Sequence, residues 1–174
     1  ARAIVALVVG EDAERRLLAE RVATRLKLGS LRAFGVSAEN VEAIATYEAG
    51  QLSIERFNLG SVAGSTIRVS GALRETETTP VGEAEIDFVS TDPGPFLALL
   101  RERLPANSLV DRLARSAEWY ADTDVQGRLQ VTDAGAVTLG LTGRVNQTAL
   151  AATAKADEIS GFLGGGKRNV EIRL

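Results

Sequence analysis

The fold is decided by the stretch from Leu31 to Leu73, which reads LRAFGVSAENVEAIATYEAGQLSIERFNLGSVAGSTIRVSGAL. Every second side chain is apolar over several short runs, and Gly or Asn residues separate these runs. An alternation of period two puts successive side chains on opposite faces of a β-strand, while Gly and Asn favour the turns between strands. The stretch therefore predicts a curved antiparallel sheet with one apolar face, which needs a second layer to cover it.

The same alternation extends on both sides of this stretch. Val22 to Leu28 predicts a preceding strand, which Gly29-Ser30 would turn. Inside the stretch, turns are expected at Glu39-Asn40, at Ala49-Gly50 and between Gly60 and Gly64, and a change of phase predicts a β-bulge near Arg56. Later strands are predicted at Ala84 to Phe88, Val125 to Val131, Val137 to Leu141, Leu150 to Ala156 and Val170 to Leu174.

Short helices are expected between some of these strands. Apolar residues at helical spacing predict helices from Phe96 to Leu104 and from about Leu109 to Tyr120. Ala3 to Leu18 predicts a strand followed by a helix, and Ile159 to Leu163 predicts one helical turn. The predicted fold is therefore mainly β with short helices (α+β). Its curved antiparallel sheet forms a groove or U shape, with helices that pack on it or cap it.

Composition excludes several classes of function. The chain has 174 residues, of which 45% are hydrophobic and 25% charged, and it contains no His, Cys or Met. Imidazole and thiol groups supply most general bases, nucleophiles and zinc ligands near neutral pH, so the sequence argues against an enzyme, a metal site or a redox pair. Its 20 basic and 23 acidic residues are interspersed, which argues against nucleic-acid binding.

The domain organisation is that of a single unit with internal similarity. Val69 to Leu73 (VSGAL) resembles Leu141 to Val145 (LTGRV), and Ala84 to Asp87 resembles Ala154 to Asp157. We expect one β-groove fragment, 1–174, of a longer protein, with approximate repeat units 22–104 and 105–174 and with 1–21 as the tail of a preceding unit. The alternative to a true repeat is chance similarity, because strand–turn–helix patterns recur in any β-rich sequence.

Three other features have ordinary structural interpretations. Gly164 to Arg168 (GGGKR) lacks the spacing and the hydroxyl residue of a phosphate-binding P-loop, so it predicts a helix end and a turn. Glu83, Glu85 and Asp87 share one strand face, which favours a solvated sheet face over an acid–base site. Asp111 and Arg115 are spaced for a routine ion pair on a helix.

Trp119 and Tyr120 form the only pair of adjacent aromatic residues. Core packing beneath the sheet is the favoured interpretation. The alternative is a half-wet, amphipathic lip beside a lipid-facing groove, because rings with a polar atom favour such sites.

The spacing of apolar residues and glycines in the sequence resembles that of the AsmA-like family of bacterial envelope proteins. The shared pattern is one of spaced apolar residues and glycines, and it contains no catalytic motif. It falls on Leu31, Val36, Gly50, Leu52, Ile54, Leu59, Ala63, Gly64, Gly71 and Leu73. A second, weaker pass of the pattern runs from Val137 to Ala156.

This resemblance implies a function for the apolar face. It implies a non-enzymatic periplasmic module of an inner-membrane-anchored envelope protein, which contributes to phospholipid transport between membranes or to outer-membrane homeostasis. The expected partners are phospholipid acyl chains and neighbouring repeat units, with no cofactor, and the charge pattern already argues against nucleic acid. The residues expected to line the groove are Leu52, Ile54, Ile67, Val69, Ile86, Phe88, Val137 and Leu139. The alternative is a structural or assembly module of the envelope or of a particle, which acts by pairing of strand edges.

Overall fold

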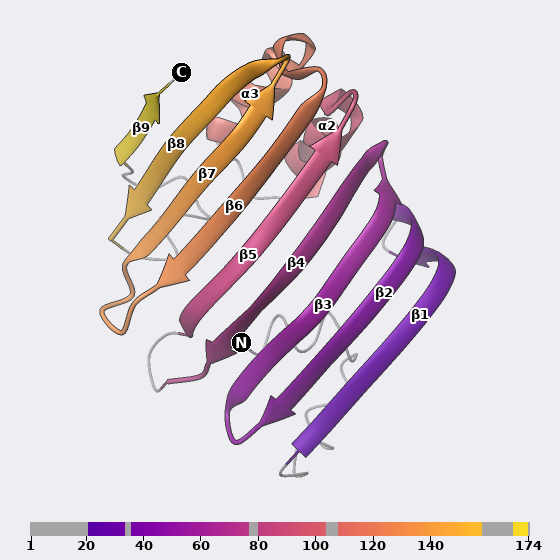
Figure 1. Ribbon diagram of the computed structural model, residues 1–174, viewed down its shortest axis with the longest axis vertical. Helices are drawn as coiled ribbons and strands as arrows, with labels where there is room; N and C mark the ends of the chain where they lie inside the picture. Colours follow the sequence, from indigo (N-terminus) through magenta and orange to yellow (C-terminus); the bar gives the residue numbers. More distant parts are fainter. Residues whose placement is uncertain (1–20, 34–35, 77–79, 104–107, 158–168, 174) are drawn as a thin grey trace.

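The computed structural model describes residues 21–33, 36–76, 80–103, 108–157 and 169–173. These residues form one nine-stranded sheet in which the spatial order of the strands is their order in the chain. Every neighbouring pair is antiparallel, and the sheet is open because β1 and β9 lie at its opposite edges (Figure 1). The prediction of a mainly β fold with a large antiparallel sheet and few short helices is therefore confirmed.

The strands are long at the start of the sheet and shorter toward its end. Their bounds are β1 (Arg21–Ala33), β2 (Val36–Glu48), β3 (Gln51–Val62), β4 (Ser65–Arg74), β5 (Val81–Ser90), β6 (Thr123–Val131), β7 (Val137–Val145), β8 (Thr148–Ala156) and β9 (Asn169–Arg173). Each described strand pairs with the one that follows it in the chain, so the order of the strands in the sheet contains no crossover.

The turns are confirmed in part. Ala49 and Gly50 have φ of 48° and 80° and reverse the chain between β2 and β3, as predicted. The bulge near Arg56 is also confirmed, because the register of β3 against β4 shifts between Ile54 and Phe57. The predicted turn at Gly29-Ser30 is wrong, since β1 continues through it to Ala33.

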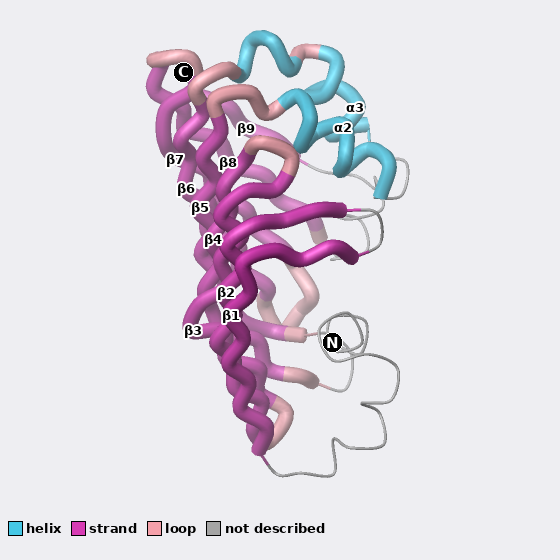
Figure 2. Tube along the Cα trace, turned by 90° about the vertical axis from the view of Figure 1, so that its right-hand side faces the viewer, coloured by secondary structure: helices cyan, strands magenta, loops and turns pink. Residues whose placement is uncertain are grey.

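Two predicted turn residues instead lie inside strands. Asn40 has φ of 50° but belongs to β2, so the turn predicted at Glu39-Asn40 is wrong. Gly60 belongs to β3, and the reversal predicted between Gly60 and Gly64 is confirmed at Ala63-Gly64. Gly60 lies so close to Asn40 that a Cβ atom on Gly60 would be 2.6 Å from the Asn40 Cβ. These residues therefore bend the strands rather than end them. The ends of β1 and β2 in this region curve toward the side of the sheet that carries the helices (Figure 2).

All described helices lie between β5 and β6. They are α2 (Gly94–Arg103), α3 (Ser108–Arg115) and the short 3-10 helix η2 (Ala117–Tyr120). The backbone N–H of Gly94 donates to the Asp92 carboxylate at 2.9 Å, which satisfies one of the free donors at the start of α2.

The single helix predicted from about Leu109 to Tyr120 is broken near Ser116, because α3 ends at Arg115 and the chain continues as η2.

The helices cover one end of one face of the sheet (Figures 1 and 2). A buried cluster forms there from Ala38, Val41 and Val62, and Phe96 and Leu99 of α2 pack against it. Phe96 and Leu99 are three residues apart, which places them on the same side of α2. The predictions for Ala3 to Leu18, for Ile159 to Leu163 and for Gly164 to Arg168 lie outside the described residues.

Candidate functional site

The register of the sheet places the predicted groove residues on one face. Cross-strand partners in an antiparallel sheet project to the same side, and Ile67 pairs with Phe88 while Val69 pairs with Ile86. On one side, Leu59 of β3 pairs with Ile67. On the other side, Gly127 of β6 pairs with Ile86 of β5 and with Leu141 of β7, so the same face continues across the sheet. We call this side the apolar face and its opposite the outer face. The apolar face carries Leu52, Ile54, Ile67, Val69, Ile86, Phe88, Val137 and Leu139.

The apolar face is only partly covered. Leu52, Ile54, Ile67, Val69, Ile86 and Leu139 are all half-buried. Two of the predicted groove residues differ from these in their surroundings. Phe88 packs on Phe96 of α2 with ring centroids 5.1 Å apart, and Val137 is 1% exposed. The middle of the face is therefore less covered than the end under α2, where Val41 is 2% exposed.

A row of buried hydroxyl groups crosses the apolar face at its helix-covered end. Ser65, Ser90 and Thr123 are direct neighbours on β4, β5 and β6, and they are 1%, 3% and 6% exposed. The Ser65 hydroxyl donates to the Ser90 hydroxyl at 2.9 Å, and Thr123 donates to the Tyr120 carbonyl oxygen. These partners satisfy the hydroxyls internally, as buried polar groups require. The row ties η2 to the sheet, and no sequence signal predicted it because it depends on register.

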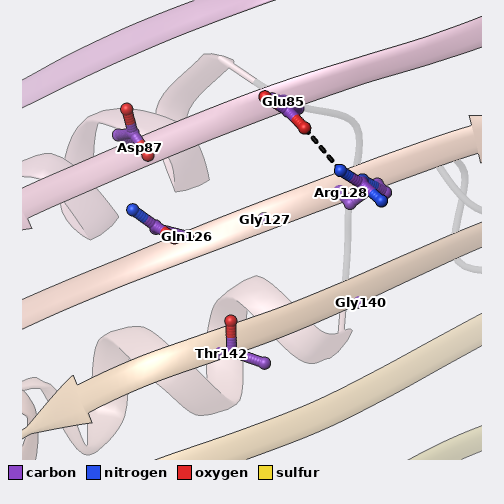
Figure 3. A pocket seen from close by; sticks show the side chains of 7 residues that line it. All are labelled: Glu85, Asp87, Gln126, Gly127, Arg128, Gly140 and Thr142. Carbon is purple, nitrogen blue, oxygen red and sulfur yellow. Dashed lines mark hydrogen bonds and ion pairs between the residues drawn. The ribbon is translucent and has the colours of Figure 1, made fainter.

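The outer face carries a shallow polar depression over β5, β6 and β7 (Figure 3). Its volume is about 460 Å³, and it is lined by Glu85, Asp87, Gln126, Gly127, Arg128, Gly140 and Thr142. A Cβ atom on Gly140 would meet nothing within 4 Å, so the missing side chain helps to open the depression. The prediction that Glu83, Glu85 and Asp87 share a solvated sheet face agrees with this geometry, since Glu83 and Glu85 are exposed.

An exposed ion pair lies on the outer face. Arg128 Nη2 is 2.6 Å from Glu85 Oε1, and this hydrogen bond, followed by the charge of Glu85, raises the pKa of Arg128. A raised arginine pKa leaves the side chain a permanent cation, so it provides no proton donor or acceptor near neutral pH. Asp87, Gln126 and Thr142 add hydrogen-bonding groups but no nucleophile with an adjacent base. The depression therefore presents charged and hydrogen-bonding side chains from three neighbouring strands.

One tyrosine titrates above its ordinary range. Burial, followed by the charge of Glu75 and a hydrogen bond to it, raises the pKa of Tyr47. The Tyr47 hydroxyl donates to Glu75 Oε2 at 3.4 Å. A tyrosine is already neutral at physiological pH, so the raised pKa of Tyr47 extends its neutral form to more alkaline pH.

Trp119 is 71% exposed, so the favoured prediction that it packs in the core is wrong. The reason is local. Trp119 lies in the 3-10 turn of η2, whose four residues include none that is buried. Ala121, two residues further along the chain, accepts a backbone hydrogen bond from Asn146 in the β7–β8 turn, which holds this segment at the end of the sheet. The predicted ion pair between the Asp111 and Arg115 side chains is not formed. Arg115 Nε instead donates to the backbone carbonyl oxygen of Asp111 at 3.2 Å.

In the described ranges, no group of three or more acidic side chains is placed to hold a metal ion. The described helices are all too short or too polar to cross a membrane. No protein-family model, no curated protein and no solved structure matches the chain.

Proposed function

We propose that this chain is a non-enzymatic lipid-binding module whose apolar face accommodates phospholipid acyl chains. In this proposal it forms part of an inner-membrane-anchored envelope protein of the bacterial periplasm. There it contributes to phospholipid transport between membranes or to outer-membrane homeostasis. The observation that supports the proposal is that the apolar face is continuous across the strands, while Ile54, Val69 and Ile86 in it are only half-buried.

Leaving the apolar face in water costs free energy, because apolar surface favours burial. Burial of apolar surface contributes about 25 cal/mol per Å², so the apolar area that this face still exposes favours binding of an apolar ligand. A solid domain core would bring these side chains to the burial of Val41, which is 2% exposed. The apolar face extends across several neighbouring strands, so a linear acyl chain can lie along it. Acyl chains need no hydrogen bonds from this face.

The proposal is tested by native mass spectrometry of the protein purified from bacterial membranes in mild detergent, with lipid extraction in parallel. We expect bound phospholipid, and we expect Val69→Thr together with Ile86→Thr to reduce its occupancy several-fold. The matched control is Ser70→Thr with Asp87→Asn, which alters the outer face of the same strands. Thr keeps strand propensity, so thermal melting separates a loss of lipid from a loss of fold.

Two results would contradict the proposal. One is an apo mass together with no transfer of labelled phospholipid between vesicles. The other is equal lipid occupancy in the apolar-face and outer-face variants.

A second candidate function is that of an assembly module acting through strand-edge pairing. It is favoured by β1, a strand of 13 residues with exposed Leu26 (39%) and Leu31 (36%), whose outer edge pairs with none of the described strands. Such an edge presents free backbone donors and acceptors to another chain. Concentration-dependent assembly in the absence of lipid would favour this function over lipid binding.

A further inference from the structure

The outer edge of β1 is the longest free strand edge in the described part of the sheet. β1 has 13 residues and pairs with β2 along its length, whereas β9 at the opposite edge has five. An edge strand presents unpaired backbone N–H and C=O groups, which another extended chain can bind. Strand-edge pairing therefore has its most extensive site here, and the side chains of β1 decide which chain can fill it.

The strands nearest this edge carry an excess of positive charge. β1 contains four basic residues and no acidic one. Together, β1 to β4 contain seven basic and four acidic residues, which is a net charge of +3, whereas the whole chain carries −3. The edge therefore has the opposite sign to the molecule as a whole, and it favours an anionic partner.

Two cations on the outer face of β1 share a single acidic neighbour. Lys27 is the cross-strand partner of Glu42, but Glu42 Oε2 is 3.4 Å from Arg56 Nη1. Arg25 lies opposite the apolar Ile44. Both Arg25 and Lys27 are exposed, and neither belongs to an ion pair among the described residues. One carboxylate thus faces three cations, so this part of the outer face stays positive.

The other face of β1 is apolar at the same level. Leu26 pairs with Ala43 and Ala43 with Phe57, which in turn pairs with Val69 of the apolar face. Leu26 is 39% exposed, and no described strand lies on its outer side. Alternate residues of a strand share a face. A strand added here would therefore place an apolar side chain beside Leu26 and its two neighbouring side chains beside the cations of the outer face.

We infer that the free edge of β1 binds an extended acidic segment of a partner protein as an added strand, in which acidic and apolar residues alternate. Its acidic side chains lie opposite Arg25 and Lys27, because opposite charges across neighbouring strands stabilise their pairing. β2, the strand that β1 already pairs with, shows the same match, with Glu48 opposite Arg21 and Glu42 opposite Lys27. The inference rests on the second candidate function, strand-edge pairing, and does not depend on lipid carriage.

A second copy of this chain fits the edge less well than an acidic segment does. Two β1 edges would set basic side chains against each other, which destabilises pairing. Pairing of β1 with β9 would match 13 residues with five, and β9 carries Glu171 and Arg173 and hence no net charge. Charge complementarity thus favours a separate, acidic chain.

The test uses the intact protein and capped, dye-labelled peptides of about the length of β1. Glu and Val alternate in the first peptide, Lys replaces Glu in the second, and the third groups the same Glu and Val residues into two blocks. We expect fluorescence anisotropy to detect binding of the first peptide alone. Hydrogen–deuterium exchange should then slow in β1 and not in β9, because an added strand protects the edge amides.

Replacing the two outer-face cations tests the charge match. Arg25→Gln with Lys27→Gln should weaken binding of the alternating Glu–Val peptide about fivefold, because two cross-strand ion pairs are lost. Arg112→Gln with Arg115→Gln removes the same charge from exposed positions of α3, and its affinity should stay within about twofold of the original chain. Sedimentation velocity defines the concentrations at which each variant is monomeric, and the titrations stay within that range.

Four results would overturn the inference: no peptide binding, equal affinity for the Glu–Val and Lys–Val peptides, equal losses in the two double variants, or binding without protection of β1. A block peptide that binds as tightly as the alternating one would also overturn it, since negative charge alone would then be recognised. Self-association through β1 without peptide binding would reject the acidic partner and keep strand-edge pairing. Native mass spectrometry for carried lipid reports on the proposed lipid-binding function independently of these results.

Discussion

At the scale of the residue, two glycines allow neighbouring strands to approach more closely than a side chain permits. Gly71 has φ of 152° and Gly143 has φ of 151°, a conformation that residues with a Cβ rarely adopt. A Cβ on Gly71 would overlap the Glu83 carbonyl oxygen and lie 2.6 Å from the Ala84 Cα. A Cβ on Gly143 would similarly lie 2.7 Å from the Val125 Cα. The sequence motifs VSGAL and LTGRV thus contain glycines with the same conformation and the same need for space.

We predict that Gly71→Ala destabilises the fold by at least about 2 kcal/mol, because it adds backbone strain and displaces β5. Chemical denaturation measures the change in the free energy of unfolding. Gly140→Ala is the matched control, since its added Cβ would meet nothing within 4 Å, and its effect should stay within about 0.5 kcal/mol. Equal losses for the two variants would show that the close approach at Gly71 contributes nothing to stability.

At the scale of the element, α2 acts as the second layer for one end of the sheet. Phe96 contacts the ring of Phe88 and, with Leu99, the buried cluster of Ala38, Val41 and Val62. The buried hydroxyl row of Ser65, Ser90 and Thr123 lies at the same end. The position of α2 is therefore set by an apolar contact and by the short connection from β5, not by helix propensity.

We predict that Phe96→Ala lowers the free energy of unfolding by about 2–3 kcal/mol, toward the lower range for a large aromatic residue because Phe96 is half-buried. Arg101→Ala on the exposed side of the same helix is the control and should change stability by less than about 0.5 kcal/mol. Urea titration followed by circular dichroism measures both. A Phe96 variant as stable as the control would mean that α2 does not hold the sheet.

At the scale of the whole molecule, the open sheet leaves β1 as an edge with charged residues. β1 carries Arg21, Arg25, Lys27 and Arg32 and no acidic residue. On β2, Glu48 is within 3.8 Å of Arg21, and Glu42 is instead 3.4 Å from Arg56. Basic side chains on an edge strand oppose pairing with a second copy, because like charges would face each other.

We predict that replacing Arg25 and Lys27 by Ser promotes self-association, which sedimentation velocity detects as a larger species at a given concentration. The original chain should associate mainly at high salt, where these charges are screened. Arg112→Ser with Arg115→Ser removes the same charge away from the edge and should leave the distribution unchanged. If both double variants associate equally, net charge rather than the β1 edge controls assembly.

Much of the fold was predictable from the sequence because strand alternation is a local property. Residues two apart share a face whatever the rest of the chain does, so the apolar positions of β3, β4 and β5 and the bulge near Arg56 followed from the pattern alone. Strand ends were predicted less well. Gly29 and Asn40 have turn chemistry, yet β1 and β2 pair on both sides of them, at Leu28 with Val41 and at Ser30 with Glu39, which keeps both residues inside strands.

The sequence by itself thus determined the β class, the apolar face and the absence of histidine and cysteine chemistry. The tertiary structure alone decided which side chains are covered. It leaves Trp119 exposed, buries Ser65 and Ser90 as a pair, and brings Arg128 onto Glu85 across two strands. The physical reason is that the backbone period within one strand decides which face of the sheet a side chain lies on. Which side chains are covered, and which pair with one another, depends instead on the register between segments far apart in the sequence.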